Sequence, residues 1–138
     1  FHSSGNQTSV SIMIDMEVNS FNCSHERKER PDWRMFLDKV GVNREIQLKD
    51  VDVFAFLDCQ SSYTATRTIA SYLKGLATAL KKPLIVIDDN TEIELDSSDV
   101  VKLAKENFLN ANSNVDQFHP SLANPSYSLD TKYKKIND

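Results

Sequence analysis

Residues 52–58 read Asp-Val-Phe-Ala-Phe-Leu-Asp, and residues 84–87 read Leu-Ile-Val-Ile. Between these two short apolar runs lie a polar turn at residues 59–64 (Cys-Gln-Ser-Ser-Tyr-Thr), a long helical pattern at Ala65–Leu80, and a stop at Lys81-Lys-Pro83. Two buried strands joined by a helix are typical of a βαβ unit with parallel strands. Because both faces of a parallel sheet must be covered, this unit predicts an α/β core.

The composition fits one ordinary globular domain. The chain has 138 residues, 40% hydrophobic and 26% charged, with a formal net charge of −4. We expect a single α/β domain at residues 1–110 and a C-terminal tail at 111–138. The acidic balance argues against a surface built for direct, sequence-specific nucleic-acid binding.

The sequence predicts a cytoplasmic protein without a membrane partner. No apolar run approaches the ~18 residues of a membrane span, and the first residues do not show the pattern of a signal peptide. The two cysteines, Cys23 and Cys59, are too few for a disulfide framework, so we interpret them as reduced, buried thiols.

Two strands are expected ahead of the βαβ unit. Residues 8–14 alternate, with Val10, Ile12 and Ile14 on one face, which predicts a half-buried strand. Residues 18–23 are interpreted as the return strand of a hairpin. A charged connector then leads to a helix at residues 31–40.

The helix at 31–40 begins with Pro31 and Asp32 and ends before Gly41. Its apolar side chains recur at helical spacing and predict one stripe. The stripe contains Trp33, Phe36, Leu37 and Val40.

The long helix carries two stripes. The wide apolar stripe, which should lie on the sheet, contains Ile69, Ala70, Leu73, Leu76, Ala77 and Leu80; the second contains Thr68, Tyr72, Gly75 and Ala79. A glycine inside a helix costs roughly 1 kcal/mol relative to alanine. Gly75 therefore indicates close approach of another backbone, either the sheet or a partner helix.

The remaining third of the chain predicts a short edge strand at residues 91–95 and a helix at 99–109 that is capped by Ser97 or Ser98. Beyond residue 110 the chain is rich in Asn, Ser and Pro, and we interpret it as a tail along the domain. Its expected anchors are Phe118, Leu122, Tyr127, Leu129 and Tyr133.

The turn after the first central strand is a candidate ligand site. Polar turns at the carboxyl ends of parallel strands, feeding a helix N-terminus, commonly bind ligands. The candidate ligand turn consists of Asp58, Ser61, Ser62, Thr64 and Arg67. The three histidines have no metal-ligand spacing with each other or with cysteine, so we assign no catalytic residue, metal or cofactor.

An ordered set of motifs resembles the TsaB (YeaZ) family, the non-catalytic companions of the enzyme TsaD, which makes threonylcarbamoyladenosine (t6A) in tRNA. The order and spacing agree from about residue 1 to residue 88. The motifs are Thr8-Ser-Val-Ser-Ile12, Leu48-Lys-Asp-Val-Asp-Val53, Ser62-Tyr-Thr-Ala-Thr-Arg67, Lys74-Gly-Leu-Ala77, Pro83-Leu-Ile-Val86 and, in the tail, Tyr127-Ser-Leu129.

The departures from the family pattern affect its turn and its size. Cys59, Gln60, Ser61 and Ala65 stand where the family has Gly, Pro, Gly and Gly, and His2 stands where it has an acidic residue. Without glycines the backbone cannot make the same turns or approach a phosphate as closely. Most of the family's second lobe is also missing.

The resemblance implies an actin-like, ribonuclease-H-like mixed sheet with helices packed on it, as a single lobe. It implies a heterodimer with a TsaD-type ATPase, formed through the helices at 31–40 and 64–80. The expected interface residues are Trp33, Phe36, Thr68, Tyr72, Gly75 and Ala79. Two alternatives remain: a homodimeric scaffold, and a nucleotide- or small-molecule-binding domain that uses the candidate ligand turn.

Overall fold

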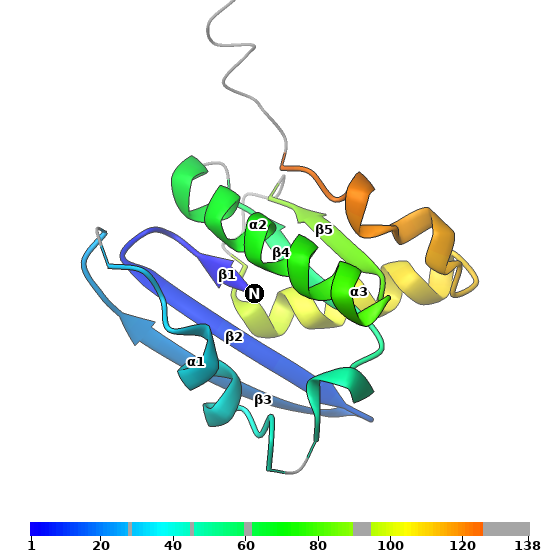
Figure 1. Ribbon diagram of the computed structural model, residues 1–138, viewed down its shortest axis with the longest axis horizontal. Helices are drawn as coiled ribbons and strands as arrows, with labels where there is room; N and C mark the ends of the chain where they lie inside the picture. The colour runs from blue at the N-terminus through cyan, green and yellow to red at the C-terminus, as the bar shows by residue number, and fades with distance from the viewer. Residues whose placement is uncertain (28, 45, 60–61, 90–94, 126–138) are drawn as a thin grey trace, which may run out of the picture.

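The computed structural model describes residues 1–27, 29–44, 46–59, 62–89 and 95–125. Its elements appear in Figure 1. The strands are β1 (His2–Ser3), β2 (Gln7–Ile14), β3 (Glu17–Ser24), β4 (Phe54–Asp58) and β5 (Leu84–Asp88); the α-helices are α1 (Trp33–Lys39), α2 (Tyr63–Leu80) and α3 (Ser97–Asn110); the short 3-10 helices are η1 (Leu48–Asp50), η2 (Val115–Phe118) and η3 (Pro120–Leu122). The expected edge strand at 91–95 and the anchors Tyr127, Leu129 and Tyr133 lie outside the described residues, apart from Leu95.

The predicted βαβ unit is confirmed. β4 and β5 pair in parallel, with Phe54 opposite Leu84 and Asp58 opposite Asp88. All five residues of β4 are buried, as expected for a strand covered on both faces. α2 connects the two strands and ends at Lys81, whose φ of 58° is the left-handed conformation that terminates many helices.

The hairpin of β2 and β3 is also confirmed, and β1 pairs antiparallel with β2 on its other side. Phe1 links this three-stranded sheet to the parallel pair. Its amine donates to the Ala55 carbonyl at 3.0 Å, and its carbonyl accepts from the Leu57 amide at 3.0 Å. This is the bonding pattern of a parallel neighbour, so the strand order across the molecule is β3-β2-β1-β4-β5.

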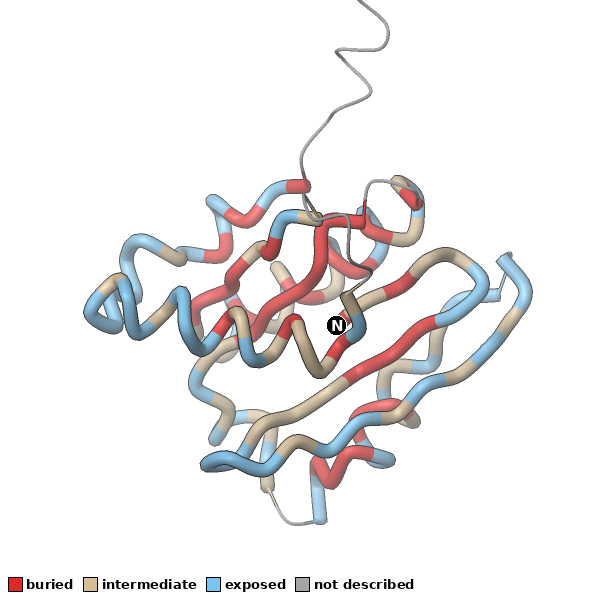
Figure 2. The backbone as a smooth tube through the Cα atoms, turned by 180° about the vertical axis from the view of Figure 1, so that it is seen from behind, coloured by how far each residue is buried: buried red, intermediate tan, exposed pale blue. Residues whose placement is uncertain are grey.

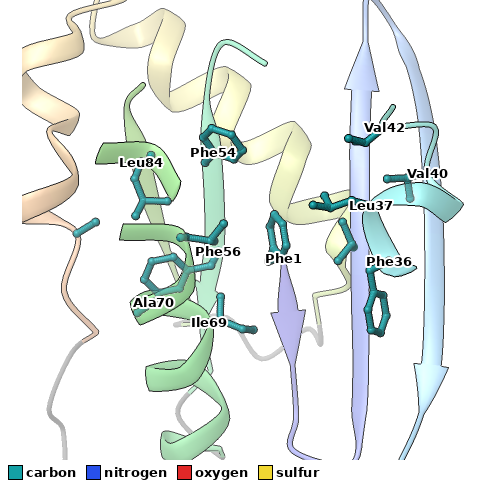
Figure 3. Close-up of a cluster of buried hydrophobic side chains, with 14 residues drawn as sticks. Phe1, Phe36, Leu37, Val40, Val42, Phe54, Phe56, Ile69, Ala70 and Leu84 are labelled. Carbon is teal, nitrogen blue, oxygen red and sulfur yellow. The ribbon is translucent and has the colours of Figure 1, made fainter. Parts of the chain in front are cut away.

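The helices form layers on the two faces of the strands. α1 and α2 lie on one face, toward the viewer in Figure 1, and α3 crosses behind the strands. Two buried clusters follow this division. The larger cluster, drawn in Figure 3, joins residues of α1 and α2 to Phe1, Val10, Phe54 and Phe56, and the smaller one joins Val100 and Ala104 of α3 to Ala55, Leu57, Ile85 and Ile87.

The prediction of a half-buried β2 is wrong. Thr8, Ser9 and Val10, in the first half of the strand, are all buried and are red in Figure 2, whereas Ile14 at the strand's end is exposed. The physical reason is α3, which covers the face that holds the serines. The Ser11 hydroxyl lies 2.6 Å from the Ser97 hydroxyl of α3, so this polar side chain is hydrogen-bonded to the covering helix.

The cap of α3 also differs from the prediction. Asp96, rather than Ser97 or Ser98, accepts from the Asp99 amide at 2.9 Å, and the Asp99 carboxylate accepts from the Asp96 amide. Hydrogen bonds from the Ser98 hydroxyl and the Asp99 amide lower the pKa of Asp96. Ser97 is instead buried against β2.

The described part of the tail packs on the domain. Pro120, Ala123 and Pro125 are buried, and the Lys74 ammonium donates to the Asn124 side chain at 2.6 Å. Phe118 contacts Phe108 of α3, with ring centroids 6.0 Å apart. Leu122 is exposed, so its expected role as an anchor is wrong.

Candidate partner interface and ligand turn

The outward side of α2 is a continuous strip of small residues. The inward side chains of Thr66, Ile69, Leu73 and Ala77 are buried on the strands. The exposed residues recur at intervals of three and four and therefore lie on one side of the helix. We call this strip the α2 face; it consists of Thr64, Thr68, Ser71, Gly75 and Ala79, all exposed.

Gly75 has open space on its outward side. A Cβ added at this position would meet no heavy atom within 4 Å among the described residues beyond its own turn of the helix. Close approach of the sheet therefore does not explain the glycine, and that alternative is wrong. The α2 face is consequently flat at its centre, and a second backbone could approach it closely.

An aromatic cluster joins α2 to α1 beside this strip. The rings of Trp33 and Tyr72 are stacked, with centroids 5.2 Å apart and planes 16° apart. Phe1 lies with its ring centroid 5.5 Å from that of Trp33 and 6.2 Å from that of Tyr72. Trp33 and Tyr72 both remain partly exposed, and burial raises the pKa of the Tyr72 phenol.

Phe36 does not belong to this surface. Only 2% of it is exposed, and its ring packs edge-on against Phe21 of β3 with centroids 5.4 Å apart. The apolar stripe of α1 turns Phe36 into the core together with Leu37. The expectation that Phe36 is presented to a partner is therefore wrong.

The other expected interface residues lie together. Thr68, Tyr72, Gly75 and Ala79 follow one another along α2, and Trp33 joins them through Tyr72. Sequence reasoning missed Ser71 and Thr64, which complete the α2 face. Their helical spacing from Thr68 was the available signal.

Two residues of the candidate ligand turn are buried. Asp58 is 3% exposed and Ser62 is 5% exposed. The Cys59 carbonyl accepts from the Ser62 amide and from the Thr66 hydroxyl, each at 3.2 Å. Ser61 lies outside the described residues. The strand end of this turn, at Asp58 and Ser62, is therefore buried within the fold.

The residues at the start of α2 point elsewhere. Thr64 and Arg67 are exposed, and the Arg67 guanidinium lies over the Tyr63 ring, 5.4 Å from its centroid. Ser62 is the N-cap of α2 by its backbone, and its side chain makes no capping hydrogen bond. The structure separates Arg67 from the buried part of the turn.

The turn between β1 and β2 closes the space beside Ser62. Gly5 has a φ of 99°, and a Cβ built on it would lie 3.0 Å from both the Arg27 guanidinium and the Ser62 hydroxyl. A side chain at position 5 would therefore be strained and crowded. The sequence shows Gly5 but not its neighbours, because these three residues come from separate parts of the chain.

Within the described residues, no group of three or more His, Cys, Asp and Glu side chains is arranged to hold a metal ion. No helix among them is long and apolar enough to cross a membrane. His25 and His119 are hydrogen-bonded to the Thr8 and Ser121 hydroxyls, at 2.7 and 2.8 Å.

The architecture defines a class. The chain is a mixed α/β domain of the actin-like, ribonuclease-H-like type, with α1 and α2 on one face of the strands and α3 on the other. Comparison with solved structures shows which proteins the chain is similar to. The chain is similar to YeaZ from Pseudomonas aeruginosa, with 27% sequence identity over 64% of its length and a TM-score of 0.53.

A second structure gives the same result. It is an uncharacterized protein described as similar to "peptidase YEAZ from Pseudomonas aeruginosa", with 26% identity over 64% of this chain and a TM-score of 0.54. The chain spans 41% of the length of each of these proteins. No protein-family model and no curated protein matches the sequence.

Proposed function

We propose that the chain is a non-catalytic interaction subunit that supports t6A modification of tRNA by binding a TsaD-type ATPase. The YeaZ-like fold supports a role as a partner subunit, because the resemblance to the TsaB (YeaZ) family implies a TsaD-type partner. The observation that carries the proposal is the α2 face, where a Cβ built on Gly75 would meet no heavy atom of the described residues beyond its own helix turn within 4 Å.

The proposed interface comprises the α2 face with Trp33 and Tyr72. Small side chains let two helices pack near the lower end of the usual interaxial range of about 8–10 Å. Partly exposed aromatic residues at the edge of such a strip supply much of the binding energy of helical interfaces. The stacking of Trp33 on Tyr72 holds these residues in one arrangement before binding, which lowers the entropy cost of association.

The proposed absence of catalysis has its own support. One similar structure is an uncharacterized protein described as similar to a peptidase. Hydrolysis of a peptide bond needs an accessible nucleophile with a base, or an activated water. The thiol of Cys59 is buried. His25 and His119 are hydrogen-bonded to hydroxyl groups of the fold. The residues therefore favour an interface over a hydrolytic site.

Co-purification tests the proposal. The chain is co-expressed with the TsaD-type enzyme of the same organism, as the original sequence, as Gly75→Arg and as Asn107→Arg. The first change adds a long side chain to the α2 face, and the control adds the same side chain to an exposed site on α3. We expect Gly75→Arg to abolish association and Asn107→Arg to preserve it.

Two outcomes would contradict the proposed interface. Equal recovery of the enzyme by both variants would show that the α2 face is not the interface. Absence of the enzyme from all three preparations, with a dimer of the chain in sedimentation that Gly75→Arg disrupts, would favour the homodimeric scaffold instead. Circular dichroism on each purified variant separates lost binding from lost folding.

A further inference from the structure

A network of hydrogen bonds ties the turn between β1 and β2 to the end of β3. We call it the His25 network; its side chains are Ser3, Thr8 and His25. The Ser3 and Thr8 hydroxyls lie 2.9 Å apart, and the Thr8 hydroxyl lies 2.7 Å from His25 Nε2. The Gly5 amide donates to the Ser3 hydroxyl at 3.2 Å. Figure 1 shows this turn beside the end of β3, so the network joins two neighbouring segments.

Two backbone groups fix the direction of every bond in the His25 network. A carbonyl can only accept, so the contact of His25 Nδ1 with the Glu26 carbonyl at 2.8 Å places the proton of the neutral ring on Nδ1. Nε2 is then an acceptor, and the Thr8 hydroxyl donates to it. A backbone amide can only donate, so the Ser3 oxygen accepts from Gly5 and its own proton goes to Thr8. Each donor of the network therefore has an acceptor.

The hydroxyl groups of the network lie on buried residues. Thr8 is 0% exposed and Ser3 is 3% exposed, whereas His25 is half-buried. A buried hydroxyl that loses its acceptor costs free energy, because no water takes the place of the missing partner. The neutral imidazole is the last acceptor of the side-chain network, so the bonds of both hydroxyls depend on it.

Protonation of His25 removes that acceptor. The imidazolium carries a proton on both nitrogens, so Nε2 would have to donate to the Thr8 oxygen. The Thr8 proton would then turn toward the Ser3 oxygen, which already accepts from Gly5, and the Ser3 proton would lose Thr8 as its acceptor. In the part of the chain that the structure describes, the Ser3 hydroxyl has no other hydrogen-bond partner. A buried hydroxyl proton is therefore left without an acceptor.

We propose that His25 is a proton-sensitive switch for the turn between β1 and β2: the neutral imidazole fixes the turn through Thr8 and Ser3, and the imidazolium releases it. Histidine is the side chain that changes charge between about pH 5 and 8, so mild acid operates the switch. The turn contains Gly5, whose Cβ position lies 3.0 Å from the Ser62 hydroxyl at the start of α2. Release of the turn therefore opens the space beside Ser62.

Other titratable groups lie on the segments around the switch. The turn itself, residues 4–7 (Ser-Gly-Asn-Gln), contains none. The Arg27 guanidinium lies against the turn, with a nitrogen 3.0 Å from the Cβ position of Gly5. Among the described residues, His25 is the titratable group that the Ser3 and Thr8 hydroxyls contact. The titratable side chains of the adjoining segments are Cys23 and Glu26 beside His25, His2 of β1, Asp58 of β4, and Tyr63 and Arg67 at the start of α2.

Hydrogen exchange of the Gly5 amide tests the switch. It is measured by NMR at pH 7.5 and pH 5, relative to the intrinsic exchange rate, in chains with an acetylated N-terminus so that the Phe1 amine does not titrate. The parent is compared with His25→Gln, whose amide stays neutral and can both accept and donate, and with His119→Gln as the matched control. We expect protection of Gly5 to fall about tenfold or more at pH 5 in the parent and in His119→Gln, and to stay constant in His25→Gln.

Three outcomes would overturn the switch. Constant protection of Gly5 in the parent would show that protonation does not release the turn, and an equal fall in His25→Gln would assign the change to another group. The nitrogen chemical shifts of the His25 ring at pH 7.5 need no variant, and a proton on Nε2 rather than on Nδ1 would contradict the bond directions. None of these results depends on a TsaD-type partner, so this inference and the proposed function can fail independently.

Discussion

Trp33 of α1 and Tyr72 of α2 lie ring on ring, with centroids 5.2 Å apart and planes within 16° of each other. The contact joins two helices that are separated in the sequence by η1 and β4. Phe1 packs against both rings from the strands below. The partner face that we propose is therefore anchored to the core at its edge.

The Trp33–Tyr72 stack should contribute a measurable coupling energy. Aromatic pairs add about 0.5–1.5 kcal/mol beyond the area they bury, so the double-mutant cycle of Trp33→Leu and Tyr72→Leu should give a coupling of about 1 kcal/mol. Urea unfolding is followed by circular dichroism rather than by tryptophan fluorescence, because Trp33 is the single tryptophan and Trp33→Leu removes it. Strict additivity of the two losses would show that the stack contributes nothing of its own.

The Phe1 amine should make stability depend on pH. Its pKa is 8.0 in the unfolded chain and about 5 in the folded chain, so between these values the unfolded state binds more protons and stability rises with pH. The chain that begins at Phe1 should be less stable at pH 5 than at pH 8, by up to roughly 4 kcal/mol. Acetylation of the amine should remove this difference while keeping the bond to Ala55, and an unchanged slope after acetylation would assign the dependence to other groups.

The open surroundings of Gly75 predict a stabilising substitution. Gly75→Ala should raise the free energy of unfolding by about 0.5–1 kcal/mol, because alanine restricts the unfolded chain and meets no neighbour in the folded one. Gly41 provides the matched control. Its φ of 104° is strained for any side chain, so Gly41→Ala should destabilise the fold. Thermal unfolding of both variants gives the two signs, and a loss of stability in Gly75→Ala would contradict the open α2 face.

The cap of α3 gives a prediction that separates hydrogen bonding from charge. Asp96→Ala should cost about 1 kcal/mol, because the Asp99 amide loses its acceptor. Asp96→Asn keeps an acceptor and should retain most of the stability at neutral pH. The pKa of Asp96 is lowered from 3.8, so the carboxylate's added contribution is present above that value and is lost as pH falls through the folded pKa. Urea titrations of the parent and both variants at pH 7 and pH 3 test this. At pH 3 the free energy of unfolding of Asp96→Asn should come closer to that of the parent than it does at pH 7, and that of Asp96→Ala should come less close.

The sequence was sufficient for the parts of the fold in which local pattern and tertiary role agree. The apolar runs at 53–57 and 84–87 and the helix between them became β4, β5 and α2 within two residues at each boundary. Pro83 and Gly41 ended their helices as expected. These signals are strong because backbone chemistry and burial favour the same structure.

The sequence was insufficient where distant residues decide a position. Ser9 and Ser11 are polar, yet α3 covers them and Ser97 hydrogen-bonds to Ser11 from 86 residues away. Phe36 occurs in a stripe beside Trp33, but only the position of β3 determines that Phe36 is buried while Trp33 stays partly exposed. The closed turn around Ser62 likewise depends on Gly5 and Arg27. Such contacts have no local periodicity from which to predict them.

The central claim is that the α2 face contacts the TsaD-type enzyme, and site-specific photo-crosslinking tests it most directly. A photoreactive residue is placed at Ser71, on that face one helical turn before Gly75, or at Asn107, an exposed site on α3. After mixing with the enzyme and irradiation, the Ser71 chain should form a cross-linked heterodimer and the Asn107 chain should not. Cross-linking from Asn107 but not from Ser71 would contradict the account.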